Sequence, residues 1–253
     1  MGDRFPYAFS YIFSNMKSPT ALTAGFVGYL MKTIPFFFLI FFAAFCSADQ
    51  KDTMNFYILD EPQNHWGDYG HILMHGMASH TEGLYEGPIE LYRTGPFVPT
   101  ISFPGIGDVV VTDEFKRKLE TSDLKGFIFR RVIKKRIVNL EWRKWDLYKE
   151  NPPIFPGSGE PEDYINERPH SPELANSIGD LWELVIKVSA KVKKVESQDS
   201  QTGLTVYLIA DTWNGDDIFR ADDVRYVYLS SKAKIWLEDN AKGFVSYRDV
   251  TLK

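Results

Sequence analysis

Three of the five histidines lie close together in the chain, at His71, His75 and His80, and imidazole is the commonest side-chain ligand of metal ions. The four-residue spacing of His71 and His75 would place both on one face of a helix, where they could share a metal ion. The zinc-protease pattern also needs a glutamate beside the first histidine, but this segment has Gly70 and Gly76 and no adjacent acidic residue. We therefore expect no metal site; a hydrolase that uses His71 or His75 with nearby carboxylates is the alternative.

Other reactive combinations lack the companion residues that their chemistry needs. Ser231 and Lys234 have the spacing of a serine acyl-enzyme motif without its partner motifs. Gly105 and Gly107 are not followed by the rest of a nucleotide-binding fingerprint. His170 lies in RPHS, a segment typical of helix capping. The sequence therefore predicts no catalytic residues, no cofactor and no enzymatic activity.

The start of the chain has the parts of an export signal behind some extra sequence. Lys32 supplies a cationic start, residues 34–46 form an uncharged apolar run, and small residues lead up to a cleavage site after Ala48. Lys32 would lie in the middle of any single membrane anchor built from this region, which is unfavourable in a bilayer. We expect a mis-assigned start codon and a signal peptide at residues 31–48, whereas a true start at Met54 would leave the protein in the cytoplasm.

Cleavage would leave residues 49–253, periplasmic or secreted and without stable membrane insertion. The leader carries three basic residues and one acidic residue, so its removal takes the net charge from −5 to −7, and it contains the single cysteine. A chain this acidic is a poor general binder of nucleic acid, because phosphate neutralisation needs clustered Lys and Arg in excess. The mature chain also has no disulfide, thiolate metal site or cysteine nucleophile.

One segment occurs twice in similar form. Residues 109–132 (VVVTDEFKRKLETSDLKGFIFRRV) resemble residues 227–250 (VYLSSKAKIWLEDNAKGFVSYRDV) if one residue is deleted. In each copy a hydroxyl residue, Thr112 or Ser230, stands where a strand gives way to helical spacing and can cap the helix. The segment therefore predicts a strand, a short helix and a strand, used twice. The matched residues are Lys116, Leu119, Glu120, Lys125, Gly126, Phe127 and Arg131 with Lys234, Leu237, Glu238, Lys242, Gly243, Phe244 and Arg248.

The mature chain divides at residues 151–163 (NPPIFPGSGEPED), a Pro- and Gly-rich stretch that we expect to be an ordered loop. It joins two similar halves, 54–150 and 172–253, of a single α+β domain. Ser171 followed by Pro172 predicts a capped helix that ends near Gly179. We expect mostly antiparallel strands with a few short helices. The expected strands are residues 56–59, 89–92, 108–111, 126–142, 181–195, 204–210, 224–229 and 244–252.

Two features suit contact with another protein. Trp142 and Trp145, three residues apart, would lie on opposite faces of a strand, so that one is buried and the other exposed. An exposed Trp145 between Arg143 and Asp146 is typical of a binding hot spot. Acidic residues in turn-forming sequence would add a complementary surface for a basic partner. These residues are Glu160, Glu162, Asp163, Asp216 and Asp217.

The segment LIADTWNGDDIFRADDVRYVYLSSKAKIWLEDNAKGFVSYRDV resembles the immunity proteins of bacterial polymorphic toxin systems, in particular the immunity protein eleven family. The similar features are an Asp-Ile-Phe-Arg turn at residues 217–220, the helix cap Ser230 and the return at Gly243 and Phe244. The resemblance implies a non-enzymatic protein that binds and blocks one cognate toxin. Trp145 and the acidic residues above are then expected to contact the toxin. A periplasmic ligand-binding module is a further alternative.

Overall fold

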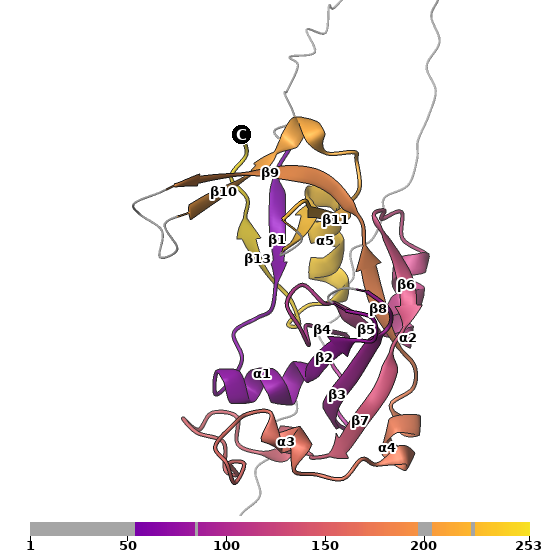
Figure 1. Cartoon of the computed structure of the whole chain (residues 1–253), viewed down its shortest axis with the longest axis vertical. Coiled ribbons are helices and arrows are strands. Elements are labelled where there is room, and N and C mark those ends of the chain that lie inside the picture. The colour runs from indigo at the N-terminus through magenta and orange to yellow at the C-terminus, as the bar shows by residue number, and fades with distance from the viewer. Residues whose placement is uncertain (1–53, 84–85, 197–203, 224–225) are drawn as a thin grey trace, which may run out of the picture. The chain divides into compact units, whose positions relative to one another are not determined.

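The structure is a computed structural model and describes residues 54–83, 86–196, 204–223 and 226–253, all within one unit that spans Lys51–Lys253 (Figure 1). The signal peptide, its cleavage site and the upstream start lie outside the described residues. Among the described residues, no helix is long and apolar enough to cross a membrane.

Thirteen strands form three sheets in the described part of the chain. The six-stranded sheet has the order β10 (Leu204–Ile209), β9 (Val188–Glu196), β11 (Ile218–Ala221), β12 (Val227–Ser230), β1 (Phe56–Asp60), β13 (Ser246–Asp249). The four-stranded sheet has the order β4 (Ile101–Ser102), β5 (Val110–Thr112), β8 (Leu181–Ile186), β6 (Phe127–Arg131), and the three-stranded sheet has β2 (Met77–His80), β3 (Ile89–Gly95), β7 (Ile133–Asn139). Neighbouring strands are antiparallel except β9 with β11 and β3 with β7.

The helices are short, and the α+β class expected from the sequence is confirmed. They are α1 (Asp68–His75), α2 (Asp113–Glu120), α3 (Asp163–Asn166), α4 (Pro172–Ser177) and α5 (Ser231–Asn240), with 3-10 turns at Trp142–Lys144 and Ala210–Thr212. The three predicted caps are confirmed, because the hydroxyls of Thr112, Ser230 and Ser171 accept hydrogen bonds from backbone N–H groups three residues later. Local sequence chemistry therefore sets where these helices begin.

Three predicted elements are wrong: two runs expected to be single strands, and one expected turn. The run at residues 126–142 is two strands, β6 and β7, which lie in different sheets and separate at Val132. The run at residues 181–195 is likewise β8 and β9, which separate at Lys187. The expected turn at residues 217–220 is mostly strand β11, because buried Ile218 and Phe219 lie between two neighbouring strands. An apolar run does not show by itself where a strand passes from one sheet to the next.

Each strand–helix–strand unit encloses a strand from the other half of the chain. β1 lies between β12 and β13, and β8 lies between β5 and β6. The registers correspond, because Phe56 faces Ser230 as Leu181 faces Thr112. All these pairings are antiparallel. The duplicated unit therefore becomes a three-stranded sheet only when the halves exchange strands.

The inserted strands β1 and β8, here called the exchanged strands, also correct the sequence alignment of the strands that follow the two helices. These are β6 in the first unit and β13 in the second, here called the return strands. Tyr57 on β1 faces Asp249, and the corresponding Trp182 on β8 faces Arg131. Arg131 is therefore equivalent to Asp249, and Arg248 is equivalent to Arg130. The deletion introduced in the sequence comparison does not apply to the return strands.

A lysine occupies the same aromatic setting in both units. Lys116 on α2 has its Nζ 4.6 Å from the ring centroid of Trp182 and 5.3 Å from that of Phe129. Lys234 on α5 has its Nζ 5.1 Å from the ring centroids of both Tyr57 and Tyr247. In each unit one ring belongs to the exchanged strand and the other to the return strand, so the cation–π contacts, each worth about 0.5–1 kcal/mol at exposed sites, tie the helix to both.

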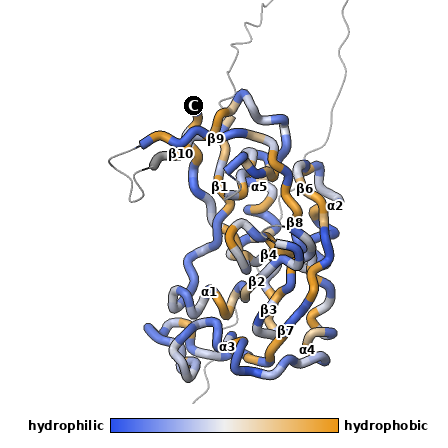
Figure 2. Tube along the Cα trace, viewed as in Figure 1, coloured by the Kyte–Doolittle hydropathy of each residue, from blue (hydrophilic) through white to orange (hydrophobic). Residues whose placement is uncertain are grey.

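The two units share one hydrophobic core. Phe115 and Leu119 of α2 are buried together with Ala233 and Leu237 of α5, and the rings of Phe115 and Trp236 are 5.5 Å apart. The apolar stretches of β4 and β8 run into the same region (Figure 2). Burial of both helix stripes confirms the predicted core faces.

We expect Leu119→Ala and Leu237→Ala each to lower the free energy of unfolding by about 2–5 kcal/mol, because each leaves a cavity in the shared core. Ile235→Ala, on the exposed side of α5, is the control and should change stability by less than about 0.5 kcal/mol. Urea unfolding measures the difference. Equal effects at Leu237 and Ile235 would contradict the assignment of the buried face.

Candidate functional site

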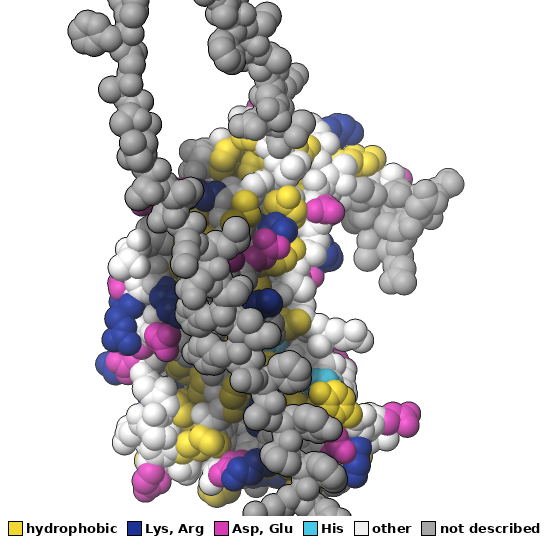
Figure 3. Space-filling view, turned by 180° about the vertical axis from the view of Figure 1, so that it is seen from behind, with side chains coloured by type: hydrophobic (Ala, Val, Ile, Leu, Met, Phe, Trp, Pro, Cys, Tyr) yellow, Lys and Arg dark blue, Asp and Glu magenta, His cyan; other side chains and the backbone are white. Residues whose placement is uncertain are grey.

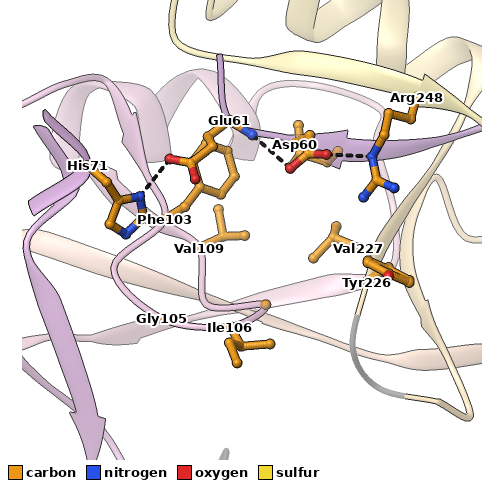
Figure 4. Close-up of a pocket in the computed structure, with 12 residues that line it drawn as sticks. Asp60, Glu61, His71, Phe103, Gly105, Ile106, Val109, Tyr226, Val227 and Arg248 are labelled. Carbon is orange, nitrogen blue, oxygen red and sulfur yellow. Dashed lines mark hydrogen bonds and ion pairs between the residues drawn. The ribbon is translucent and has the colours of Figure 1, made fainter. Parts of the chain in front are cut away.

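A cavity of about 530 Å³ lies where the end of β1 meets α1 and the loop between β4 and β5 (Figure 4). Its volume is in the range of small-molecule sites. The polar groups are Asp60, Glu61, His71 and Arg248. The rest of the wall is mainly apolar and consists of Leu59, Phe103, Ile106, Val109, Tyr226 and Val227 with the glycines of the loop.

Glu61 joins the two histidines of α1 at one edge of this cavity. Its Oε2 lies 2.8 Å from Nδ1 of His71 and 2.9 Å from Nε2 of His75 (Figure 4 shows the first contact). Asn64 Nδ2 also donates a hydrogen bond to this oxygen at 3.0 Å, whereas the contact with His75 is close without hydrogen-bond geometry. The acidic partner that the sequence around His71 lacks therefore comes from the residue that follows β1.

Strand pairing places Glu61. Asp60, the last residue of β1, faces Ser246 of β13, whose hydroxyl donates to the carbonyl of Glu61 at 2.6 Å. The side chain of Asp60 accepts from Arg248 Nε at 2.6 Å. The exchange of β1 into the second unit thus determines where this carboxylate lies.

Buried polar residues of β3 hold the end of α1. Arg93 Nη2 donates to the carbonyl of Met74 at 3.3 Å, and Thr94 Oγ1 donates to that of Leu73 at 2.9 Å. A cation at a helix C-terminus also interacts favourably with the helix dipole. Burial lowers the pKa of Arg93 to about 10, so its guanidinium stays charged at neutral pH. These contacts fix the carbonyls beside His75.

Gly70 and Gly76, which do not fit the zinc-protease pattern, allow α1 to pack closely against the neighbouring backbone. A Cβ on Gly70 would lie 1.6 Å from the carbonyl oxygen of His65, and one on Gly76 would lie 2.4 Å from that of Tyr92. Gly76 also has φ 79°, which an L side chain rarely adopts. Both glycines permit close backbone approach, and His71 and His75 remain on one helical face.

The environment favours a charged Glu61 and a neutral His75. Burial alone would raise the pKa of Glu61, but close contacts with His71 and His75 and their charge bring this pKa well below its usual range. Burial lowers the pKa of His75, whose side chain is 1% exposed, and Glu61 opposes that shift. The backbone N–H of Phe103 donates to Nδ1 of His75 at 3.4 Å, which places the proton of the neutral ring on Nε2. Nε2 itself is buried and has no hydrogen-bond partner among the described residues, although Glu61 Oε2 lies 2.9 Å away.

The other histidines of interest have separate partners. His80 lies 3.0 Å from Asp108 through Nε2. His170 accepts from the backbone N–H of Ile137 at 3.0 Å. Among the described residues, Glu61, His71 and His75 are the group of potential metal ligands whose donor atoms lie within 4.8 Å of one another.

Asp217 is not placed as expected of a residue that contacts a toxin. It is buried, its Oδ1 accepts from the Ser230 hydroxyl at 2.8 Å, and its Oδ2 accepts from the backbone N–H of Lys125 at 3.1 Å. It therefore links the loop after α2 to the cap of α5. Asp216, next to it, is half-buried and accepts from the hydroxyl of Ser189.

Trp145 and the acidic residues near α3 belong to one segment, residues 145–163, and Trp145 lies beside His65, Arg143 and Tyr148. Trp142 begins a 3-10 turn and is buried, which corrects the expected strand, while Trp145 is half-buried with its ring 6.1 Å from that of Tyr164. Glu160 and Glu162 are exposed and Asp163 is half-buried in the chain just before Tyr164. On the face seen in Figure 3, acidic and basic side chains are interspersed.

Comparisons with protein-family models, curated proteins and solved structures give no match to this chain.

We expect the stability of the protein to fall as the pH drops below 6.5, in part because of His75. Its pKa is lower in the folded state than the value of 6.5 for an unperturbed histidine, so the unfolded chain binds a proton there that the folded chain does not. His75→Gln should therefore lose less stability than the unaltered protein between pH 7 and 5. Urea unfolding in chelator-containing buffer measures this, with His65→Gln as control. Equal pH dependence in all three proteins would contradict the role of His75.

Proposed function

We propose that this chain is a non-catalytic immunity protein that binds and neutralises a cognate protein toxin. Its binding surface, the aromatic–acidic surface, comprises Trp145, Tyr148, Phe155, Glu160 and Glu162. The observation that carries the proposal is that Tyr148, Phe155, Glu160 and Glu162 are exposed on one segment, residues 145–162, which contacts of Tyr69 and Tyr164 hold in place. The resemblance of residues 208–250 to the immunity protein eleven family supports the same role.

Two tyrosines, buried Tyr164 and half-buried Tyr69, anchor this surface to the body of the protein. Tyr164 is fully buried, its hydroxyl donates to the carbonyl of Ile154 at 2.5 Å, and its ring packs near that of Trp145. Tyr69 of α1 donates to the carbonyl of Gly159 at 2.5 Å. A segment held in this way loses little conformational freedom when a partner binds, which favours affinity.

The side chains on the surface suit a basic partner. Tyr148 is 98% exposed and Phe155 is 48% exposed, and aromatic residues of this kind are enriched among binding hot spots. Glu160 and Glu162 follow them on the same segment as exposed carboxylates, which speed the approach of a positively charged protein. Asp163 contributes less, because it accepts hydrogen bonds from Ser158 and Asn166.

The second candidate is a hydrolase, which the contact of Glu61 with His71 favours. That carboxylate could orient the imidazole as a general base toward a substrate in the cavity. Hydrolysis of model ester, peptide and phosphate substrates, measured with the unaltered protein and with His71→Ala, tests this candidate. Turnover that His71→Ala abolishes, together with no protection from the toxin, would favour the enzyme.

The decisive assay of the immunity proposal is co-expression with the toxin encoded beside this gene, with and without residues 1–48. Survival and recovery of a stable complex are the expected results. A chain that gives no protection in either form and forms no complex would contradict the proposal.

We expect Tyr148→Ala to weaken toxin binding by about 30-fold, mainly through faster dissociation, as for a hot-spot residue worth about 2 kcal/mol. The high exposure of this side chain means that its loss should leave folding stability unchanged. Trp145→Ala should weaken binding too, but its half-buried ring means that stability must be measured in parallel.

Reversing the charges of Glu160 and Glu162 to lysine should slow association by about tenfold at low salt and flatten its salt dependence. The matched control is the double variant Asp239→Lys with Asp249→Lys. Both residues are exposed and lie elsewhere on the surface, Asp239 on α5 and Asp249 on β13. Stopped-flow or surface plasmon resonance kinetics measure the association rate of each double variant. Equal slowing by both double variants would indicate a general charge effect and not this surface.

A further inference from the structure

We propose that Glu61, His71 and His75 form a binding site for a divalent transition-metal ion, zinc by preference, with an open coordination position that faces the cavity. This inference is independent of toxin binding, because it concerns a different set of residues. It reverses the expectation from sequence that the histidine cluster holds no metal.

The donor atoms already converge. Oε2 of Glu61 lies 2.8 Å from His71 Nδ1 and 2.9 Å from His75 Nε2, and all three atoms lie within 4.8 Å of one another. Ligand atoms on one tetrahedral zinc ion are about 3.3 Å apart, given metal–ligand bonds of about 2.0–2.1 Å. Small side-chain rotations would therefore open the two short contacts and close the gap between the imidazoles.

The ligand types select the metal. Two imidazoles and one carboxylate match the three-ligand sets of open zinc sites, in which a water or another small ligand takes the fourth position. Magnesium and calcium instead prefer sets made wholly of oxygen atoms. The four-residue spacing of the histidines on α1 gives the same one-sided presentation as known helical histidine pairs.

The fourth position has access to solvent. His75 is 1% exposed and forms the closed side of the cluster, whereas His71 and Glu61 are 31% and 32% exposed. Both of these residues line the cavity (Figure 4). A fourth ligand bound from the cavity would lie beside apolar walls, which include Leu59 and Phe103.

Metal binding would keep one neighbouring hydrogen bond, from Asn64, and lose another, from Phe103. Asn64 Nδ2 donates to Glu61 Oε2 at 3.0 Å, an outer contact of the type that orients ligating carboxylates. A metal on His75 Nε2 would move the ring proton to Nδ1, so the 3.4 Å hydrogen bond from the N–H of Phe103 would be lost. That bond is long for its type, so its loss costs little compared with three metal–ligand bonds.

The test is calorimetric titration of the purified full chain with zinc chloride after dialysis against EDTA. We expect binding of one equivalent, a rise in thermal unfolding temperature, and no comparable binding of magnesium. Cobalt, bound in place of zinc, should give the visible absorption bands of a four-coordinate ion. Absence of stoichiometric zinc binding would overturn the proposal.

Matched variants assign the site. Glu61→Gln and His71→Gln should each weaken zinc binding by more than about 100-fold, and Asn64→Ala, which removes an outer contact, by about 10-fold. His65→Gln removes an exposed histidine next to α1 and should bind zinc as the unaltered protein does. Undiminished zinc binding by both ligand variants would place the metal elsewhere and refute the assignment.

Discussion

The insertion of β1 between β12 and β13 is the constraint on which the rest of the structure depends. Its pairing joins Phe56, near the start of the described chain, to Ser230, and the next residue, Tyr57, to Asp249 near the end. The reciprocal insertion of β8 between β5 and β6 means that each half completes the sheet of the other. Neither half buries its helix stripe alone, because α2 and α5 pack into the same core. Pairings this distant in sequence carry a loop-closure entropy cost and are slow to form.

One difference between equivalent positions of the two units, Glu183 on β8 and Ile58 on β1, shapes the cavity. Arg130 on β6 makes two hydrogen bonds of 2.8 Å with Glu183, which faces it on β8. The equivalent Arg248 faces apolar Ile58 on β1 and pairs instead with Asp60, two residues further on. The first unit therefore closes its sheet face with an ion pair, whereas the second directs its ion pair to the cavity edge.

Helix α1 connects the two regions to which we assign function. His71 and His75 contact Glu61 on the cavity side, while the ring of Tyr69 lies 6.1 Å from that of Tyr164 beneath the aromatic–acidic surface. The helix is held by close backbone contacts and by the buried side chain of Arg93. A metal ion at the cluster would tie this helix to the end of β1.

Local chemistry in the sequence determined the α+β class, the capped helices and the duplicated strand–helix–strand unit, since hydroxyl caps and apolar spacing act over a few residues. Contacts between distant strands decided the rest. They split each long apolar run between two sheets, buried Asp217 under the cap of α5, and brought Glu61 to His71 and His75. Nothing in the neighbourhood of a residue along the chain reports which strand will lie beside it, because pairing register depends on how the whole core closes.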